Sequence, residues 1–194
     1  MDPIGFVPEC ACLEPDGTAF ELERRLRGCF PDHGLVSAAI AVASRAHAAH
    51  VRAEGTPYVV HPLRVALTLA RRGETAETVG AALCHDVFED AFALSHEVYR
   101  LGPAVSQLVE VLTDDWHNDY LDRIAAAGRA AALIKLADRI DNIRFLHRTD
   151  GFKHRRYVVE TRRDFPVIAD AAQAPDLAEA LWALVAWQEA IPGF

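Results

Sequence analysis

Hydrophobic positions along this chain recur mostly at helical spacing. Leu63, Ala66, Leu67 and Ala70 stand at i, i+3, i+4 and i+7, the pattern of an amphipathic helix over 61–72. Strand-like alternation is weak and confined to residues 58–61. Similar patterns predict further helices over 35–53, 75–90, 95–101, 103–113, 118–148, 152–172 and 176–191, with a break or bend near Gly128. We therefore predict an all-α fold, a bundle of about eight to ten helices.

The N-terminal segment, residues 1–33, has a different pattern. Residues 1–17 hold three prolines and two glycines, which is typical of an irregular segment. Thr18 and Glu21 have the spacing of a capping box, which predicts one short helix that ends before Gly34. We therefore predict an N-terminal extension with one short helix over 1–33 and one domain over 34–194.

Composition narrows the class of protein. A chain of 194 residues with 51% hydrophobic residues can bury a sizeable core. Its net charge of −8 disfavours broad nucleic-acid binding, because such domains usually carry a basic surface. No apolar run approaches the roughly 18–20 residues of a membrane span, and the start of the chain does not resemble a signal peptide. We expect a cytoplasmic protein with neither nucleic acid nor membrane as a partner.

The segment His85-Asp86-Val-Phe-Glu89-Asp90 places four ionisable residues at the end of an apolar helix. On a helix, Glu89 would lie beside His85 and Asp90 beside Asp86. Clustered carboxylates repel one another and oppose the helix dipole at a C-terminus. A divalent cation would remove that repulsion, and histidine with aspartate is a reasonable mixed ligand set. The segment favours a metal site over a solvated helix end.

Two other segments carry candidate ligands. Asp138 follows an apolar run and needs a partner if it is buried, either a metal or a salt bridge to Arg139 or Arg144. His61 precedes a proline at a predicted helix start, where a histidine can be structural or a ligand.

Together the three segments resemble the HD-domain phosphohydrolases, specifically the hydrolase domain of the RelA/SpoT alarmone family. That family reads approximately A-H-x-G-Q-x-R-K-x-G-x-P-Y-x-x-H-P, then A-A-L-L-H-D-x-x-E-D, then K-L-A-D-R-x-x-N-x-R. The matching segments of this chain are 46–62, 81–90 and 135–144, in the same order, and the resemblance extends over about 35–163.

The resemblance implies a role for each matching residue. The ligands of a single divalent metal, usually manganese, would be His61, His85, Asp86 and Asp138. The acidic pair that positions or deprotonates the attacking water would be Glu89 and Asp90. The residues around the nucleotide and its phosphates would be Arg52, Tyr58, Asn142 and Arg144, with Arg156 and Tyr157 on a later helix.

The resemblance also implies a reaction. We expect a metal-dependent 3′-pyrophosphohydrolase that acts on a nucleotide alarmone, (p)ppGpp or (p)ppApp, and releases pyrophosphate. The alternatives are an HD-family nucleotidase acting at the 5′ phosphate and a non-catalytic alarmone-binding module. Only 31 residues follow residue 163, which predicts a stand-alone small alarmone hydrolase without a synthetase domain. Tryptophans in the last predicted helix leave a homo-oligomer open.

Some positions depart from the family pattern. The second basic residue before glycine is replaced by Ala53 and Glu54, Asp141 stands before Asn142, and Ala91 follows the acidic pair. We expect these positions to lie near the substrate, where they put the identity of the base in doubt. Residues 139–163 carry eight basic and three acidic residues, a local charge of +5, which indicates either an anion site or a solvated basic face.

Overall fold

Helices form all of the regular secondary structure in the described part of the chain. The computed structural model describes residues 17–52, 55–114, 119–146 and 151–191. The elements are α1 (Ala19–Cys29), α2 (Gly34–Ala46), α3 (Val60–Arg71), α4 (Ala76–Cys84), α5 (Val87–Asp90), the 3₁₀ helix η1 (Phe92–Leu94), α6 (Ser95–Arg100), α7 (Pro103–Leu112), α8 (Tyr120–Ala126), α9 (Arg129–Arg144), α10 (Gly151–Asp164), α11 (Pro166–Ala172) and α12 (Pro175–Glu189). The predicted all-α class is confirmed.

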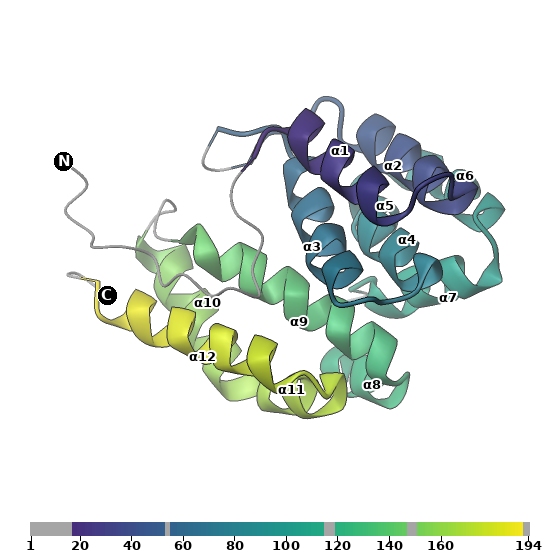
Figure 1. The fold of residues 1–194 in the computed structure, drawn as a ribbon. Helices are drawn as coiled ribbons and strands as arrows, with labels where there is room; N and C mark the ends of the chain where they lie inside the picture. Colours follow the sequence, from purple (N-terminus) through teal and green to yellow (C-terminus); the bar gives the residue numbers. More distant parts are fainter. Residues whose placement is uncertain (1–16, 53–54, 115–118, 147–150, 192–194) are drawn as a thin grey trace.

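Helix α9 runs through the middle of the molecule. In Figure 1, α1 to α7 lie on one side of it, and α10, α11 and α12 lie on the other. Helix α3 packs against α1, α4 and α9, and α12 and α11 pack against α9. A polar side chain on the inner face of α3 or α9 is therefore buried and needs a partner inside the protein.

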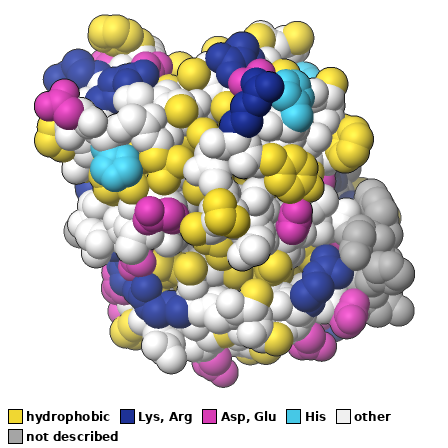
Figure 2. Space-filling model, turned by 90° about the vertical axis from the view of Figure 1, so that its right-hand side faces the viewer, with side chains coloured by type: hydrophobic (Ala, Val, Ile, Leu, Met, Phe, Trp, Pro, Cys, Tyr) yellow, Lys and Arg dark blue, Asp and Glu magenta, His cyan; other side chains and the backbone are white. Residues whose placement is uncertain are grey.

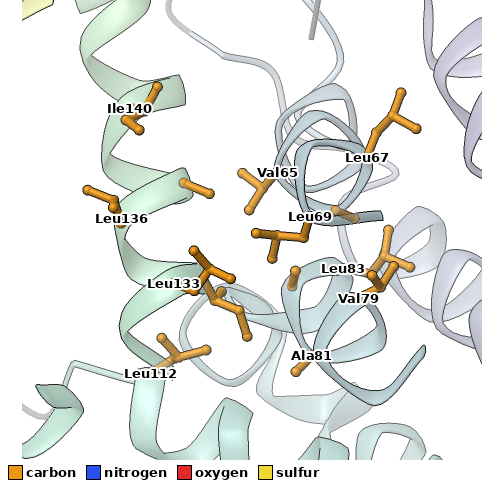
Figure 3. Close-up of a cluster of buried hydrophobic side chains, with 14 of the residues drawn as sticks. Val65, Leu67, Leu69, Val79, Ala81, Leu83, Leu112, Leu133, Leu136 and Ile140 are labelled. Atoms are coloured by element: carbon orange, nitrogen blue, oxygen red, sulfur yellow. The ribbon is translucent and has the colours of Figure 1, made fainter. Parts of the chain in front are cut away.

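The core lies where α3, α4 and α9 meet. Figure 3 shows Val65 and Leu69 of α3 directed toward α9, where Leu133 faces them. Every residue of α3 from Val60 to Ala70 is buried. Because α3 is enclosed along its length, the histidine and arginine in its first two turns are fixed by their surroundings, which gives the site below a rigid frame.

Several predicted helices are divided in the structure, which raises their number above the expected range. The helix predicted over 75–90 consists of α4 and α5, with a turn at His85 and Asp86. The helix predicted over 152–172 ends at Asp164, and α11 begins with Pro166, which cannot continue a hydrogen-bonded helix. Gly128, at φ 104°, separates α8 from α9 as predicted, in a conformation that favours glycine.

The short helix predicted within residues 1–33 is α1. The Thr18 side chain accepts a hydrogen bond from the Glu21 backbone amide, and the Glu21 carboxylate accepts one from the Thr18 amide, so the predicted capping box is present. Leu22 and Leu26 are fully buried in the common core. This part of the predicted extension therefore packs as one body with the helices that follow.

Charges of both signs share the surface. Figure 2 shows basic, acidic and hydrophobic side chains intermingled on the face that looks to the right in Figure 1. Among the described helices, none is both long enough and apolar enough to span a bilayer.

Candidate metal centre and active site

Four side chains predicted as metal ligands converge where α3, α4 and α9 meet. His61 comes from the first turn of α3, His85 and Asp86 from the turn between α4 and α5, and Asp138 from α9. His61 Nε2 lies 3.2 Å from Asp138 Oδ1 and 3.8 Å from Asp86 Oδ2. His85 Nε2 lies 3.2 Å from Asp86 Oδ1 and 3.7 Å from Asp138 Oδ1. The structure therefore brings together residues that are 77 positions apart in the sequence.

Each histidine of this cluster uses its other ring nitrogen for a structural hydrogen bond. His85 Nδ1 lies 2.7 Å from the Ala82 carbonyl oxygen, which can only accept, so Nδ1 carries the proton. His61 Nδ1 lies 2.7 Å from Asp141 Oδ2, which also accepts, so this Nδ1 carries the proton as well. Both Nε2 atoms are left to face the carboxylates, and His85 Nε2 is buried without a hydrogen-bond partner. Such an arrangement fits two imidazoles that ligate a metal.

The charges at the cluster favour a bound cation. Burial opposes ionisation of Asp138, yet Lys135, His61 and His85 hold its pKa well below the usual range. Burial alone would lower the pKa of His85, but Asp86 and Asp138 raise it to about 9. The cluster thus has two ionised carboxylates that draw positive charge onto the imidazoles. A divalent ion would replace those protons, and the mixed nitrogen and oxygen ligand set suits several divalent metals.

Asp141 is a functional residue that the sequence interpretation misplaced. We expected it to lie near the substrate, but it is buried behind His61, with 7% of its surface exposed. Its carboxylate accepts the His61 Nδ1 hydrogen bond and two from Arg64, from Nε at 2.6 Å and from Nη2 at 3.0 Å. The departure at this position therefore concerns the support of a metal ligand. The spacing of Asp141 three residues after Asp138, on a helix that is largely buried, was the available signal.

Asp138 has partners other than the two arginines considered from the sequence. Lys135 Nζ lies 3.0 Å from Asp138 Oδ2, and Asn142 Nδ2 donates to Asp138 Oδ1 at 2.6 Å. Burial would lower the pKa of Lys135, but Asp138 more than offsets this and raises it. Lys135 is a second residue that sequence reasoning left without a role, although it lies one helical turn before Asp138.

The predicted acidic pair lies at the exposed edge of the cluster, on α5. The Glu89 carboxylate accepts a hydrogen bond from the Asp114 backbone amide at 2.8 Å. The pKa of Glu89 is raised by partial burial and by Asp86, and the same two causes raise the pKa of Asp90. Both side chains are solvent-exposed, whereas His61, His85 and Asp138 are buried. The two carboxylates therefore lie on the solvent-exposed side of the cluster.

Four of the six predicted substrate residues gather near the cluster. Tyr58 donates its hydroxyl to Asp86 Oδ2 at 2.8 Å. Arg52 Nη2 donates to Asn142 Oδ1 at 3.0 Å, and its guanidinium lies 5.7 Å from the centre of the Tyr58 ring. Burial raises the pKa of Tyr157. The charge of Asp138 also raises this pKa, and that of Lys135 lowers it. These four side chains are half-buried, so each keeps part of its surface exposed to solvent.

The other two predicted substrate residues lie elsewhere. Arg144 lines a small pocket together with Arg64 and Asp141, on the far side of α9 from Asn142. Its guanidinium lies 5.3 Å from the centre of the Phe145 ring. Arg156 is exposed on α10, with its Nε 3.6 Å from Glu160 Oε1.

Three arginines of the basic stretch over 139–163 contact other parts of the described protein. The Arg139 guanidinium packs 4.0 Å from the centre of the Tyr157 ring and 4.1 Å from that of Phe165, so it is a core contact. Arg162 pairs with Glu189 at 2.7 Å, and Arg163 pairs with its neighbour Asp164 at 2.6 Å. Arg139 and Arg162 therefore support contacts between helices, and the local charge of +5 includes arginines that already have partners.

Comparison with known proteins identifies the class. Residues 39–131 match the family model of the HD domain. A guanosine-3′,5′-bis(diphosphate) 3′-pyrophosphohydrolase of Aquifex aeolicus is 32% identical over 157 residues, which cover 75% of this chain and 23% of that protein. A GTP pyrophosphokinase of Brucella ovis is 32% identical over 178 residues, with 84% and 24% covered. The chain spans less than a quarter of the length of these curated relatives.

A solved structure has a similar fold. It is described as "A metazoan ortholog of SpoT hydrolyzes ppGpp and plays a role in starvation responses", and it is 27% identical to this chain with a TM-score of 0.66. The match covers 78% of this chain and 94% of that one. Residues 39–131 are therefore similar to an HD domain, and the fold of the chain is similar to that of an ortholog of SpoT.

Proposed function

We propose that this chain removes pyrophosphate from the 3′ position of a nucleotide alarmone, (p)ppGpp or (p)ppApp, and leaves the 5′-phosphorylated nucleoside. The observation that carries the proposal is the convergence of His61, His85, Asp86 and Asp138 beneath an exposed acidic pair. The name of the Aquifex protein and the description of the metazoan SpoT ortholog support the same reaction.

The relatives have names that describe opposite reactions. The Aquifex protein is named a pyrophosphohydrolase, while the Brucella protein is named a pyrophosphokinase. Each alignment covers only 23% or 24% of the relative, so the name of the whole relative does not decide what this region does. The site favours hydrolysis, because it places carboxylates that can accept a proton from water beside a cluster suited to a metal.

The metal-ligand cluster fits a single divalent ion, for which we propose Mn²⁺. When bound, that ion would polarise the phosphoryl group and help to activate water. His85 is held for this task by the Ala82 carbonyl, and His61 is held by Asp141. Tyr58 fixes the orientation of the Asp86 carboxylate by donating to Oδ2.

Glu89 and Asp90 are the proposed proton acceptors. Their raised pKa values bring them closer to the working pH, which makes a carboxylate a better general base than one that ionises at a low pH. The Asp114 amide restricts Glu89 by a hydrogen bond at 2.8 Å. Asp90 remains exposed beside the cluster, so it is the better placed of the two to meet an entering water.

Cationic groups along the opening suit a substrate rich in phosphate. Arg52 is held by Asn142, and Lys135 is held by Asp138, so both carry fixed positive charge near the cluster. Fixed cations stabilise the charge that develops on a transferred phosphoryl group and its leaving group. Tyr157 offers an aromatic face at the same opening. Roles for Arg144 and Arg156 remain predictions that would require the substrate to extend beyond this group.

The test is a turnover assay with product analysis. Purified protein is incubated with Mn²⁺ or with EDTA, and with ppGpp, pppGpp, ppApp or common 5′ nucleotides, and the products are separated by ion-exchange chromatography. We expect metal-dependent release of pyrophosphate from at least one alarmone. Release of the 5′ phosphate instead would identify a nucleotidase, and binding of alarmone without turnover would identify a binding module. Either result would overturn the proposal.

A further inference from the structure

A second group of metal-ligating side chains lies beside the first cluster. His47 stands at the C-terminal cap of α2, His50 lies in the turn that follows, and Asp90 is the last residue of α5. His47 Nδ1 is 3.3 Å from His50 Nδ1 and 3.9 Å from Asp90 Oδ2. Each of the three residues offers one possible ligand atom, and these three atoms lie within 4.8 Å of one another.

The spacing of these atoms matches a tetrahedral ion. Zinc binds imidazole nitrogen at about 2.0–2.1 Å, so two nitrogens on one tetrahedral ion are about 3.3 Å apart. The two Nδ1 atoms are separated by 3.3 Å. The Asp90 oxygen is farther away, at 3.9 Å, but this side chain is exposed and can turn toward the imidazoles.

Both histidines are held in place by the backbone and by a neighbouring ring. The His50 amide donates to the His47 carbonyl at 3.1 Å, and the Tyr58 amide donates to the His50 carbonyl at 2.9 Å. The Tyr58 ring lies against the His47 imidazole, with centroids 4.7 Å apart and planes 31° apart. The site is therefore organised before any ligand arrives, which lowers the ordering cost of binding.

The local electrostatics favour a cation at this position. Burial lowers the pKa of His47 to about 4, so its imidazole is neutral near pH 7 and has a free lone pair. Asp90 lies close to Asp86, whose negative charge raises the pKa of Asp90. An ion beside Asp90 would relieve this repulsion.

We propose that His47, His50 and Asp90 bind a second metal ion of the Zn²⁺ type, distinct from the ion of the first cluster. Two imidazoles and one carboxylate suit zinc, and three protein ligands leave a coordination position open to water. Tyr58 separates the two sites, since its ring packs on His47 while its hydroxyl binds Asp86. This proposal concerns binding, and it bears on the reaction proposed above at one point: an ion held by Asp90 would leave Glu89 as the proton acceptor.

Counting bound zinc tests the proposal. The chain is stripped with a chelator, dialysed against Zn²⁺ and analysed by elemental mass spectrometry. We expect two ions per wild-type chain and one per His50→Gln chain. Glutamine stands at this position in the family pattern A-H-x-G-Q, so the variant should fold, which circular dichroism would check. His96→Gln is the matched control: His96 is exposed and its Nδ1 lies 3.0 Å from the Ala93 carbonyl oxygen, so this variant should keep both ions.

A crystal of the wild-type chain soaked in Zn²⁺ provides a measurement that needs no variant. Anomalous scattering at the zinc edge should show an ion between the two Nδ1 atoms and the Asp90 carboxylate. One ion per wild-type chain, two ions in His50→Gln, loss of an ion in His96→Gln, or no anomalous peak beside His47 would each overturn the proposal.

Discussion

The buried pair of Asp141 and Arg64 behind His61 gives a quantitative prediction. Arg64 is 3% exposed and Asp141 is 7% exposed, and both nitrogens of the guanidinium fork contact the carboxylate. Asp141→Asn keeps the shape and one acceptor oxygen but removes the charge. Breaking a buried ion pair from one side typically costs about 3–5 kcal/mol. The Arg64 guanidinium also lies 4.4 Å from the centre of the Phe145 ring, so we expect a loss near the lower limit, about 3 kcal/mol.

The same substitution should weaken metal binding by a different route. Asp141 fixes the His61 tautomer and makes Nε2 a stronger ligand, and loss of such a support typically lowers metal affinity about 10–100-fold. Because asparagine can still accept the Nδ1 hydrogen bond, we expect a loss of roughly tenfold. Urea unfolding in EDTA measures stability without the contribution of the metal, and competition with a chelating dye measures affinity.

A double variant separates the two effects. Arg64→Met with Asp141→Asn removes both charges and leaves a side chain of similar length, so most of the lost stability should return. Metal affinity should stay low, because His61 still faces an uncharged partner. Unchanged stability in Asp141→Asn, or metal affinity that recovers in the double variant, would refute this account of the pair.

Three further predictions follow from the same geometry. Glu89→Gln and Asp90→Asn should each lower turnover by about 10²–10⁴-fold, while zinc or manganese at the first cluster still binds, which a kinetic assay beside the dye competition would show. Metal binding at pH 7–8 should release protons, because the pKa of His85 is raised to about 9 in the metal-free protein. Metal affinity should therefore fall as pH falls. Calorimetry in buffers of different ionisation enthalpy would detect the release of protons. Arg139→Lys should destabilise the protein by about 1–2 kcal/mol although it preserves the charge, because lysine does not reproduce the planar stacking on Tyr157 and Phe165. Thermal unfolding would measure the difference, with Arg163→Lys as the exposed control.

Much of the fold was predictable from local pattern. The capping box at Thr18 and the glycine at 128 act within one turn of the chain, so the sequence is sufficient to place them. The turn at His85 and Asp86 was missed because the apolar spacing of α4 continues into α5 without a glycine or proline. That turn directs His85 and Asp86 toward Asp138 and therefore matters more to the site than any predicted helix end.

The candidate ligands came from two kinds of signal. His85, Asp86 and Asp138 are polar residues next to apolar stretches, and a buried polar group must have a partner, whereas His61 was singled out by the family resemblance. What the sequence did not reveal is which partner each one has. Asp138 binds Lys135 and Asn142, one helical turn before and after it, whereas the sequence had suggested Arg139 or Arg144. Choosing among basic residues at similar spacing requires the packing of α3 against α9, which is a long-range property.

Charge counted along the chain proved a poor guide to charge at the site. Arg139 and Arg162 raise the local count over 139–163, yet one is stacked in the core and the other pairs with Glu189. Arg52, from a stretch that the sequence marked as depleted in positive charge, lies beside Asn142 at the opening. A linear count treats each arginine as equally available, whereas helix packing determines which guanidinium already has a carboxylate or an aromatic ring to contact. For the proposed phosphate substrate, the cations that matter are those fixed next to the candidate metal ligands; within the described residues, Arg52 before α3 and Lys135 on α9 lie there.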